Sequence, residues 1–214
     1  MKHITFYLDF ISPYAYLAFE ALPQALVGHS YCVTYKPVLF AALLKHHGQL
    51  GPAEVAGKRE WTYRQVLWLA RALGIDLQLP AQHPFNPLPL LRLAVAADPQ
   101  GLPNRYVCET IFKHVWQGGQ DATEPQRLQS LTDLLAPFQA PQDGAQAVKA
   151  KAQLIAHTDE AIAQGVFGVP TFAVDGKLFW GLDALPMLQA RLAGDSWFDT
   201  AWDAAASVAQ GVRR

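Results

Sequence analysis

The chain has 214 residues, of which 51% are hydrophobic and 16% are charged, so it is long and apolar enough to bury a large core. Its 17 basic and 18 acidic residues are spread along the sequence and give a formal net charge of −1 at pH 7. This balance argues against a nucleic-acid or anionic-membrane partner, and no stretch reaches the roughly 20 apolar residues that span a bilayer.

The N-terminus and the cysteines indicate a reduced, cytoplasmic setting. Asp9 interrupts the first apolar run and no small-residue cleavage site follows, so the segment does not resemble a secretory signal. Cys32 and Cys108 are far apart and form neither a Cys-x-x-Cys motif nor a disulfide framework.

The chain begins with a strand followed by a helix. Residues Ile4–Phe10 are rich in β-branched and aromatic side chains, as in a strand buried on both faces. Ser12-Pro13 then opens an apolar helical run, Tyr14–Leu26, because serine caps the first turn and proline at the first helical position loses no hydrogen bond. This hydroxyl lies at the carboxyl end of a strand and at a helix N-terminus, where open α/β sheets bind ligands and an anion is favoured. Capping alone would also explain a serine here.

A second strand and a run of helices follow. A strand at Tyr31–Pro37 completes a β-α-β unit, which predicts a parallel pair of strands. Phe40–His46 favours a short helix, and Gly48–Gly57 a loop near the mouth of the crevice. The next segments predict helices at Lys58–Leu73, Leu90–Ala97, Asn104–Trp116, Leu128–Leu135 and Ala145–Gln164, with a proline-rich loop at Asp76–Pro89.

Strand signals return near the C-terminus. Thr171–Val174 and Lys177–Trp180 flank Asp175-Gly176, a dipeptide typical of a hairpin turn. The last segments predict a helix at Asp183–Leu192 and a surface helix at Ser196–Arg214, whose inner side carries Trp197, Phe198 and Trp202.

The order of elements predicts an α/β protein with a split domain. The two ends supply β-α-β and β-β-α, which together make a four-stranded mixed sheet. The predicted architecture is a thioredoxin-like fold, residues 1–39 and 165–214, interrupted by an all-helical insertion domain, residues 40–164.

Two motifs at the two ends of the chain resemble a known family. Asp9-Phe10-Ile11-Ser12-Pro13-Tyr14 and the run from Val166 to Phe172, followed by Phe179-Trp180-Gly181-Leu182-Asp183, resemble the 2-hydroxychromene-2-carboxylate isomerases. These enzymes are glutathione-dependent relatives of the kappa-class glutathione transferases and of DsbA-like oxidoreductases. The related dithiol oxidoreductases begin this helix with Cys-x-x-Cys, whereas this chain has Ser12 and Ala15 there, which excludes dithiol exchange at that site.

The resemblance implies a binding site for glutathione. Ser12 would donate a hydrogen bond to the glutathione thiolate and act as the catalytic residue. A cis Val169-Pro170 bond would present the main chain of Val169 to the cysteinyl unit, with a rigid turn as the structural alternative. Trp180, Leu182 and Asp183 would line the tripeptide groove, although capping of the helix predicted at Asp183–Leu192 would also explain Asp183.

The chain departs from the family in the loop at Gly51–Glu54. The family has an asparagine there that helps to bind the tripeptide, and this chain has Glu54. Lys58 is expected to bind a glutathione carboxylate instead, with Arg59 as an alternative. Asn86 and Arg92 are candidates to bind a carboxylate substrate, against the alternatives of a turn residue and a solvated helix face. The family likeness also implies a homodimer.

The residues and the resemblance are compatible with three functions. The first is glutathione-dependent isomerisation of an aromatic pyruvate-type carboxylate in aromatic hydrocarbon (naphthalene) degradation, by reversible thiolate addition. The second is a kappa-like glutathione transferase or peroxidase, which consumes glutathione. The third is a non-catalytic thioredoxin-fold module that binds peptides or anions through the cis-proline groove.

Other reactive side chains offer weaker candidates. The seven histidines show no metal-ligand spacing, so no metal site is expected. Cys108 and His114 lie six residues apart on one predicted helix and point to different faces, so Cys108 is expected to be a buried small residue. Trp61, Trp68 and Trp116 are expected in the core of the insertion, or in part as an aromatic wall for a planar ligand.

Overall fold

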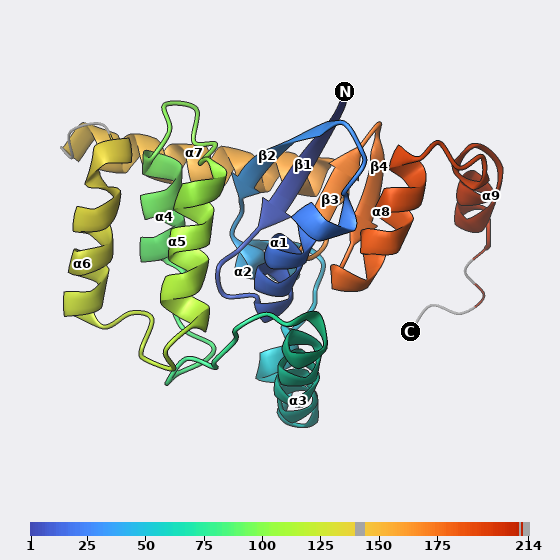
Figure 1. Ribbon diagram of the computed structural model, residues 1–214. Helices are drawn as coiled ribbons and strands as arrows, with labels where there is room; N and C mark the ends of the chain where they lie inside the picture. Colours follow the sequence, from blue (N-terminus) through green and yellow to red (C-terminus); the bar gives the residue numbers. More distant parts are fainter. Residues whose placement is uncertain (140–143, 210, 212–214) are drawn as a thin grey trace.

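A four-stranded sheet forms the centre of the molecule (Figure 1). The computed structural model describes residues 1–139, 144–209 and 211. The strands are β1 (Lys2–Leu8), β2 (Tyr31–Pro37), β3 (Thr171–Val174) and β4 (Lys177–Trp180), in the order β2-β1-β3-β4. β1 pairs in parallel with β2 and antiparallel with β3, and β3 pairs antiparallel with β4. The predicted mixed sheet and its parallel first pair are confirmed.

Helices cover both faces and both edges of this sheet. They are α1 (Pro13–Ala25), α2 (Phe40–His46), α3 (Ala56–Leu73), α4 (Leu88–Ala96), α5 (Arg105–Trp116), α6 (Pro125–Leu135), α7 (Gly144–Ala163), α8 (Leu185–Leu192) and α9 (Trp197–Ala206). Short 3₁₀ turns lie at η1 (Pro52–Glu54), η2 (Ala136–Phe138) and η3 (Leu182–Ala184). Figure 1 shows α4, α5 and α6 side by side beyond the β2 edge, α3 next to α1, and α8 and α9 beyond β4.

The alternation of side chains along the strands divides the core in two. Phe6 of β1 and Tyr35 of β2 face α1 and pack on Phe19, with ring centroids 6.5 and 5.4 Å from that of Phe19. On the opposite face Tyr7 donates a hydrogen bond to Gln164 near the end of α7. The central strand is therefore buried on both faces, as its apolar composition predicts.

Several predicted boundaries shift when the chain folds. β1 starts and ends two residues earlier than predicted, because the chain turns at Asp9 to enter α1. The helix predicted at Asp183–Leu192 begins as the 3₁₀ turn η3, and the prediction of a helix throughout Ser196–Arg214 is wrong, because α9 ends at Ala206 and residues 207–209 are not helical. The predicted positions 210 and 212–214 lie outside the described residues.

The aromatic predictions are partly wrong. Trp116 is fully buried, but Trp61 and Trp68 are 62% and 64% exposed, because α3 uses its other side against α1. Phe198 and Trp202 of α9 pack on Phe179 of β4 as expected, with centroids 5.8 and 5.3 Å apart, whereas Trp197, also expected on this inner side, is 43% exposed. Across the part of the chain that the structure describes, helices fall short of the length and apolarity needed to cross a membrane.

Candidate active site at the N-terminus of α1

Ser12 begins α1 and lies at the centre of the candidate site. Its main chain is extended, and its Oγ accepts a hydrogen bond from the amide of Ala15 at 3.2 Å, while Pro13 occupies the first helical position. The residue is 6% exposed. The predicted capped helix start is confirmed, so a buried hydroxyl lies beside the amides of a helix N-terminus.

A second segment from the far end of the sequence meets this hydroxyl. The Val169-Pro170 bond is cis, as the family likeness implies. The Ser12 hydroxyl donates to the carbonyl oxygen of Val169 at 3.4 Å, and the amide of Gly181 donates to that of Pro170 at 2.9 Å. The fold thus joins the two motifs that lie more than 150 residues apart in the sequence.

Asp9 anchors the turn that leads into Ser12. The side chain is fully buried, and its two oxygens accept from the amides of Ile11 at 3.1 Å and Phe40 at 2.9 Å. Burial raises the pKa of Asp9 to about 7, and the backbone amides that it accepts from offset only part of this rise. One carboxyl group therefore ties the end of β1, the turn and the start of α2 together.

Two side chains, one from α5 and one from the loop between α3 and α4, contact the carbonyl groups of the same turn. Trp116 of α5 donates its indole N–H to the carbonyl oxygen of Phe10 at 2.9 Å. His83 Nε2 lies 2.8 Å from the carbonyl oxygen of Ile11, and His83 Nδ1 lies 2.9 Å from the hydroxyl of Tyr63. A carbonyl can only accept, so the neutral ring carries its proton on Nε2, and the Tyr63 hydroxyl shares its one proton between Nδ1 and the carbonyl oxygen of His83, 3.0 Å away. Burial lowers the pKa of His83, which favours this neutral form.

These supporting residues were missed by the sequence reasoning. The sequence places Trp116 in the core but does not reveal its hydrogen bond, and no pattern distinguishes His83 within the proline-rich loop. The only local signal for a role of His83 is its position next to Pro84, and its distance along the sequence from Ile11 does not indicate a contact between the two residues. Loop residues gain their partners from the tertiary fold, which periodicity does not reveal.

Trp180 packs over the cis-proline loop. It is 55% exposed, and its ring centroid lies 4.9 Å from that of Phe167. A Cβ atom added at Gly168 would lie 2.7 Å from the indole nitrogen of Trp180. The absence of a Cβ atom at Gly168 thus lets the indole approach the main chain immediately before Val169.

If the chain binds glutathione as the family resemblance implies, Gly168→Ala should displace this indole and weaken that binding several-fold without unfolding the protein, because an exposed side chain can move aside. Isothermal titration calorimetry with glutathione measures the change. Gly144→Ala is the matched control, because Gly144 at the start of α7 has open space around it. Equal affinities for the two variants would contradict this role of the Trp180 contact.

Asp183 and Leu182 lie in η3, next to the first turn of α1. The alternative interpretation of Asp183 as the cap of the helix predicted at Asp183–Leu192 is wrong: Ala184 immediately precedes α8, and no side chain caps it. Asp183 is exposed, and its charge adds to the effect of burial in raising the pKa of Tyr14. The Tyr14 hydroxyl donates to Gln65 of α3 at 2.6 Å, so η3, α1 and α3 meet near Ser12.

The remaining predicted residues lie around or outside this centre. Lys58 is exposed in the first turn of α3, and Glu54 accepts from the amide of Gly51 at 2.6 Å, which turns its carboxylate back onto its own loop. Asn86 accepts from the amide of Leu88 at 3.1 Å at the start of α4, and Arg92 is exposed on that helix. Within the described residues, no hydrogen bond or ion pair joins Asn86 or Arg92 to the Ser12 region.

The thiols and potential metal ligands lie elsewhere. Cys108 is fully buried in α5 and burial raises the pKa of its thiol, which agrees with the expected packing role. In the ranges 1–139, 144–209 and 211, no cluster of three or more histidine, cysteine or acidic side chains could hold a metal ion.

A mixed sheet whose first helix begins opposite a cis-proline loop defines a thioredoxin-fold protein. Within that class, the chain belongs to the DSBA-like thioredoxin domain family, whose model matches residues 3–193. The fold and family expected from the sequence are thereby confirmed.

The relatives include two kinds of enzyme. The chain is 26% identical over 207 residues to glutathione S-transferase kappa 1 of Rattus norvegicus, covering 89% of this chain and 90% of the relative. It is 27% identical over 201 residues to 2-hydroxychromene-2-carboxylate isomerase of Sphingobium xenophagum, covering 89% and 98%. A solved structure of a 2-hydroxychromene-2-carboxylate isomerase superposes with a TM-score of 0.70 at 21% identity, covering 96% of this chain and all of that one.

Proposed function

We propose that this protein is a glutathione-dependent isomerase that converts 2-hydroxychromene-2-carboxylate, or a closely similar aromatic pyruvate-type compound, into its ring-opened trans isomer. The proposal rests on one observation above all, the buried Ser12 hydroxyl at the N-terminus of α1 beside the main chain of Val169. Relatives named as isomerases of this substrate support it.

The groups around Ser12 fit glutathione. The carbonyl oxygen of Val169 accepts only the long 3.4 Å bond from Ser12, and its amide has no partner among the described residues. An extended cysteinyl unit can pair with both groups as an added strand does. The Ser12 hydroxyl and the helix dipole of α1 then favour an anion at the position of the sulfur.

Each predicted residue has a role in binding glutathione or the substrate. Ser12 donates its hydrogen bond to the bound sulfur, Trp180 and Leu182 cover the tripeptide, and Asp183 and Lys58 bind its charged ends. Asn86 and Arg92 remain the proposed partners of the substrate carboxylate. When bound, glutathione would supply a thiolate that adds reversibly to a conjugated carbon and is released unchanged.

The decisive experiment follows glutathione and the substrate together. We expect the substrate to equilibrate with its trans isomer at a rate proportional to enzyme, while the total concentration of free glutathione stays constant over many turnovers. Chromatography of the substrate and a thiol assay on the same samples measure both quantities. Isomerisation that proceeds equally well without glutathione would contradict the proposal.

A kappa-like glutathione transferase is the second candidate, and the likeness to the rat kappa enzyme favours it. A transferase consumes one glutathione for each product molecule, so the same assay would show the thiol falling in step with product. Binding of glutathione without any turnover of electrophiles or chromene substrates would leave only a binding module.

A further inference from the structure

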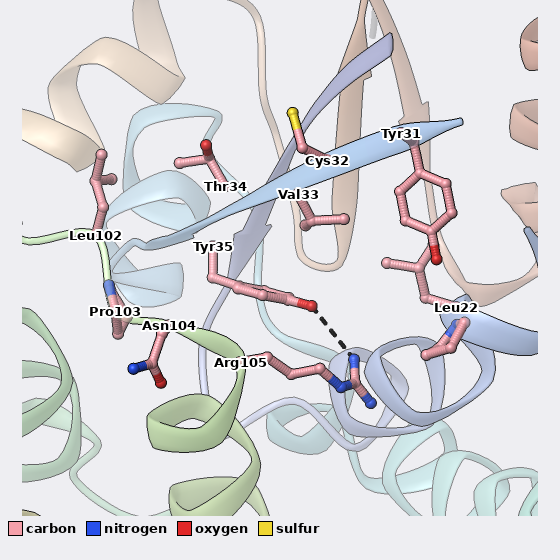
Figure 2. Close-up of a pocket in the computed structure, with 11 residues that line it drawn as sticks. Leu22, Tyr31, Cys32, Val33, Thr34, Tyr35, Leu102, Pro103, Asn104 and Arg105 are labelled. Carbon is pink, nitrogen blue, oxygen red and sulfur yellow. Dashed lines mark hydrogen bonds between the residues drawn. The ribbon is translucent and has the colours of Figure 1, made fainter. Parts of the chain in front are cut away.

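A cavity of about 570 Å³ lies at the edge of the sheet (Figure 2). We call it the Arg105 cavity, and it is lined by Leu22 and Pro23 of α1, by residues 31–35 of β2, and by Leu102, Pro103, Asn104 and Arg105. Its volume falls within the range of sites that hold small organic molecules, roughly 300 to 1,000 Å³.

The Arg105 cavity is separate from the Ser12 site. α1 begins beside Ser12 and reaches the cavity about ten residues later, or roughly 15 Å along a helix. α5 begins at Arg105 in the cavity and ends at Trp116, which holds the turn before Ser12. The two sites therefore occupy opposite ends of the same pair of helices.

The Arg105 side chain is fixed in place. Its Nη1 donates to the carbonyl oxygen of Phe19 and to the hydroxyl of Tyr35, both at 3.3 Å, and its guanidinium lies 4.1 Å from the centroid of the Phe19 ring. A guanidinium held in this way loses little further side-chain entropy when it binds a ligand.

Half of this guanidinium is left without an acceptor. Among the described residues, Nε and Nη2 of Arg105 have no hydrogen-bond partner and no carboxylate lies within 4.0 Å, whereas Arg191 pairs with two carboxylates. The nearby acid Glu109 pairs with Lys113. Glu20 of α1 has a buried Oε1 without a hydrogen-bond partner, but it lies more than 4.0 Å from the guanidinium and acts on Arg105 only through its charge. The Nε and Nη2 edge matches the two oxygens of a carboxylate.

The walls of the cavity add an apolar surface beside this cation. Figure 2 shows Tyr31, Val33 and Tyr35 on the same side of β2 as Arg105, with Cys32 on the other side. Leu22 and Pro23 close the cavity from α1. The Tyr31 hydroxyl has no partner among the described residues and can donate to a ligand.

We infer that the Arg105 cavity binds a small organic carboxylate with an apolar body, independently of the Ser12 site. The carboxylate pairs with the free edge of Arg105, and the apolar body packs between the side chains of β2 and the end of α1. Charge-assisted hydrogen bonds between the carboxylate and the guanidinium, in a partly desolvated pocket, are the strongest interactions of such a complex.

Phenylacetate tests this inference, with its neutral amide as the matched ligand. In the presence of saturating glutathione, we expect titration calorimetry to show phenylacetate binding at least about 10-fold more tightly than phenylacetamide, and Arg105→Gln to remove this preference. Arg71→Gln removes an equal charge from an exposed position on α3 and should leave both affinities unchanged.

Chemical-shift mapping of the unaltered protein provides a measurement that does not depend on a variant. Phenylacetate should shift the amides of residues 31–35 and 102–105. Shifts confined to residues 12 and 167–170, absence of binding, or equal binding of acid and amide would each overturn the inference. These binding results test the Arg105 cavity alone. The proposed isomerase activity is tested separately, by the turnover of substrate and the concentration of glutathione.

Discussion

Replacement of Ser12 by alanine should lower turnover by roughly 100-fold to 1,000-fold, the usual effect of removing one preorganised donor from a developing or bound anion. Ser12 is 6% exposed, so water replaces its hydroxyl poorly. The same change should raise the pKa of the bound glutathione thiol, because the thiolate loses a donor while the amides of α1 remain. A pH titration of the ultraviolet thiolate absorbance in the binary complex measures this shift.

A loss of stability must be separated from this effect. Ser12 also caps α1, and loss of a cap costs about 1 kcal/mol, which urea unfolding measures independently. Ser12→Thr keeps both the hydroxyl and the cap, so it should restore most of the turnover and the low thiol pKa. If serine, threonine and alanine at this position gave the same thiol pKa, Ser12 would be a cap and nothing more.

The strands and the start of α1 could be predicted because local signals agree with the tertiary fold. β2, β3, β4 and α2 have the predicted bounds, and the hairpin turn at Asp175-Gly176 has positive φ at both residues, as its composition indicates. The convergence of Ser12 with Val169 followed from the topology, since both lie at ends of neighbouring strands.

The partners of the turn before Ser12 could not be predicted in this way. His83 and Trp116 reach it from a loop and a helix end whose positions depend on how α3, α4 and α5 pack. The exposure of Trp61 and Trp68 has a similar origin, because a helical period marks a face but not which neighbour covers it. Arg105 was one of 17 basic residues in the sequence, and only its half-used guanidinium in the fold distinguishes it.

Asp9 should make the protein less stable as the pH rises towards neutrality. The pKa of Asp9 is about 7 in the folded protein and near 3.8 as an ordinary aspartate, so over that window the folded state keeps a proton that the unfolded chain releases. Stability from this group is greatest below pH 4 and is lost as the pH rises through 7. The loss amounts to about 2.5 kcal/mol between pH 5 and pH 8.

Comparison with Asp9→Asn isolates this contribution, since the asparagine does not titrate. In the variant, the side-chain NH2 group faces one of the two backbone N–H groups and cannot accept its hydrogen bond. This lowers the free energy of unfolding by the same amount at every pH, so it cancels when the two pH values are compared. The free energy of unfolding in urea, taken as variant minus wild type, should therefore be about 2.5 kcal/mol larger at pH 8 than at pH 5. Asp159→Asn removes an exposed carboxylate from α7 and serves as the control. A wild-type minus variant difference that is constant with pH would mean that the amides of Ile11 and Phe40 keep Asp9 ionised, and that burial does not govern its charge.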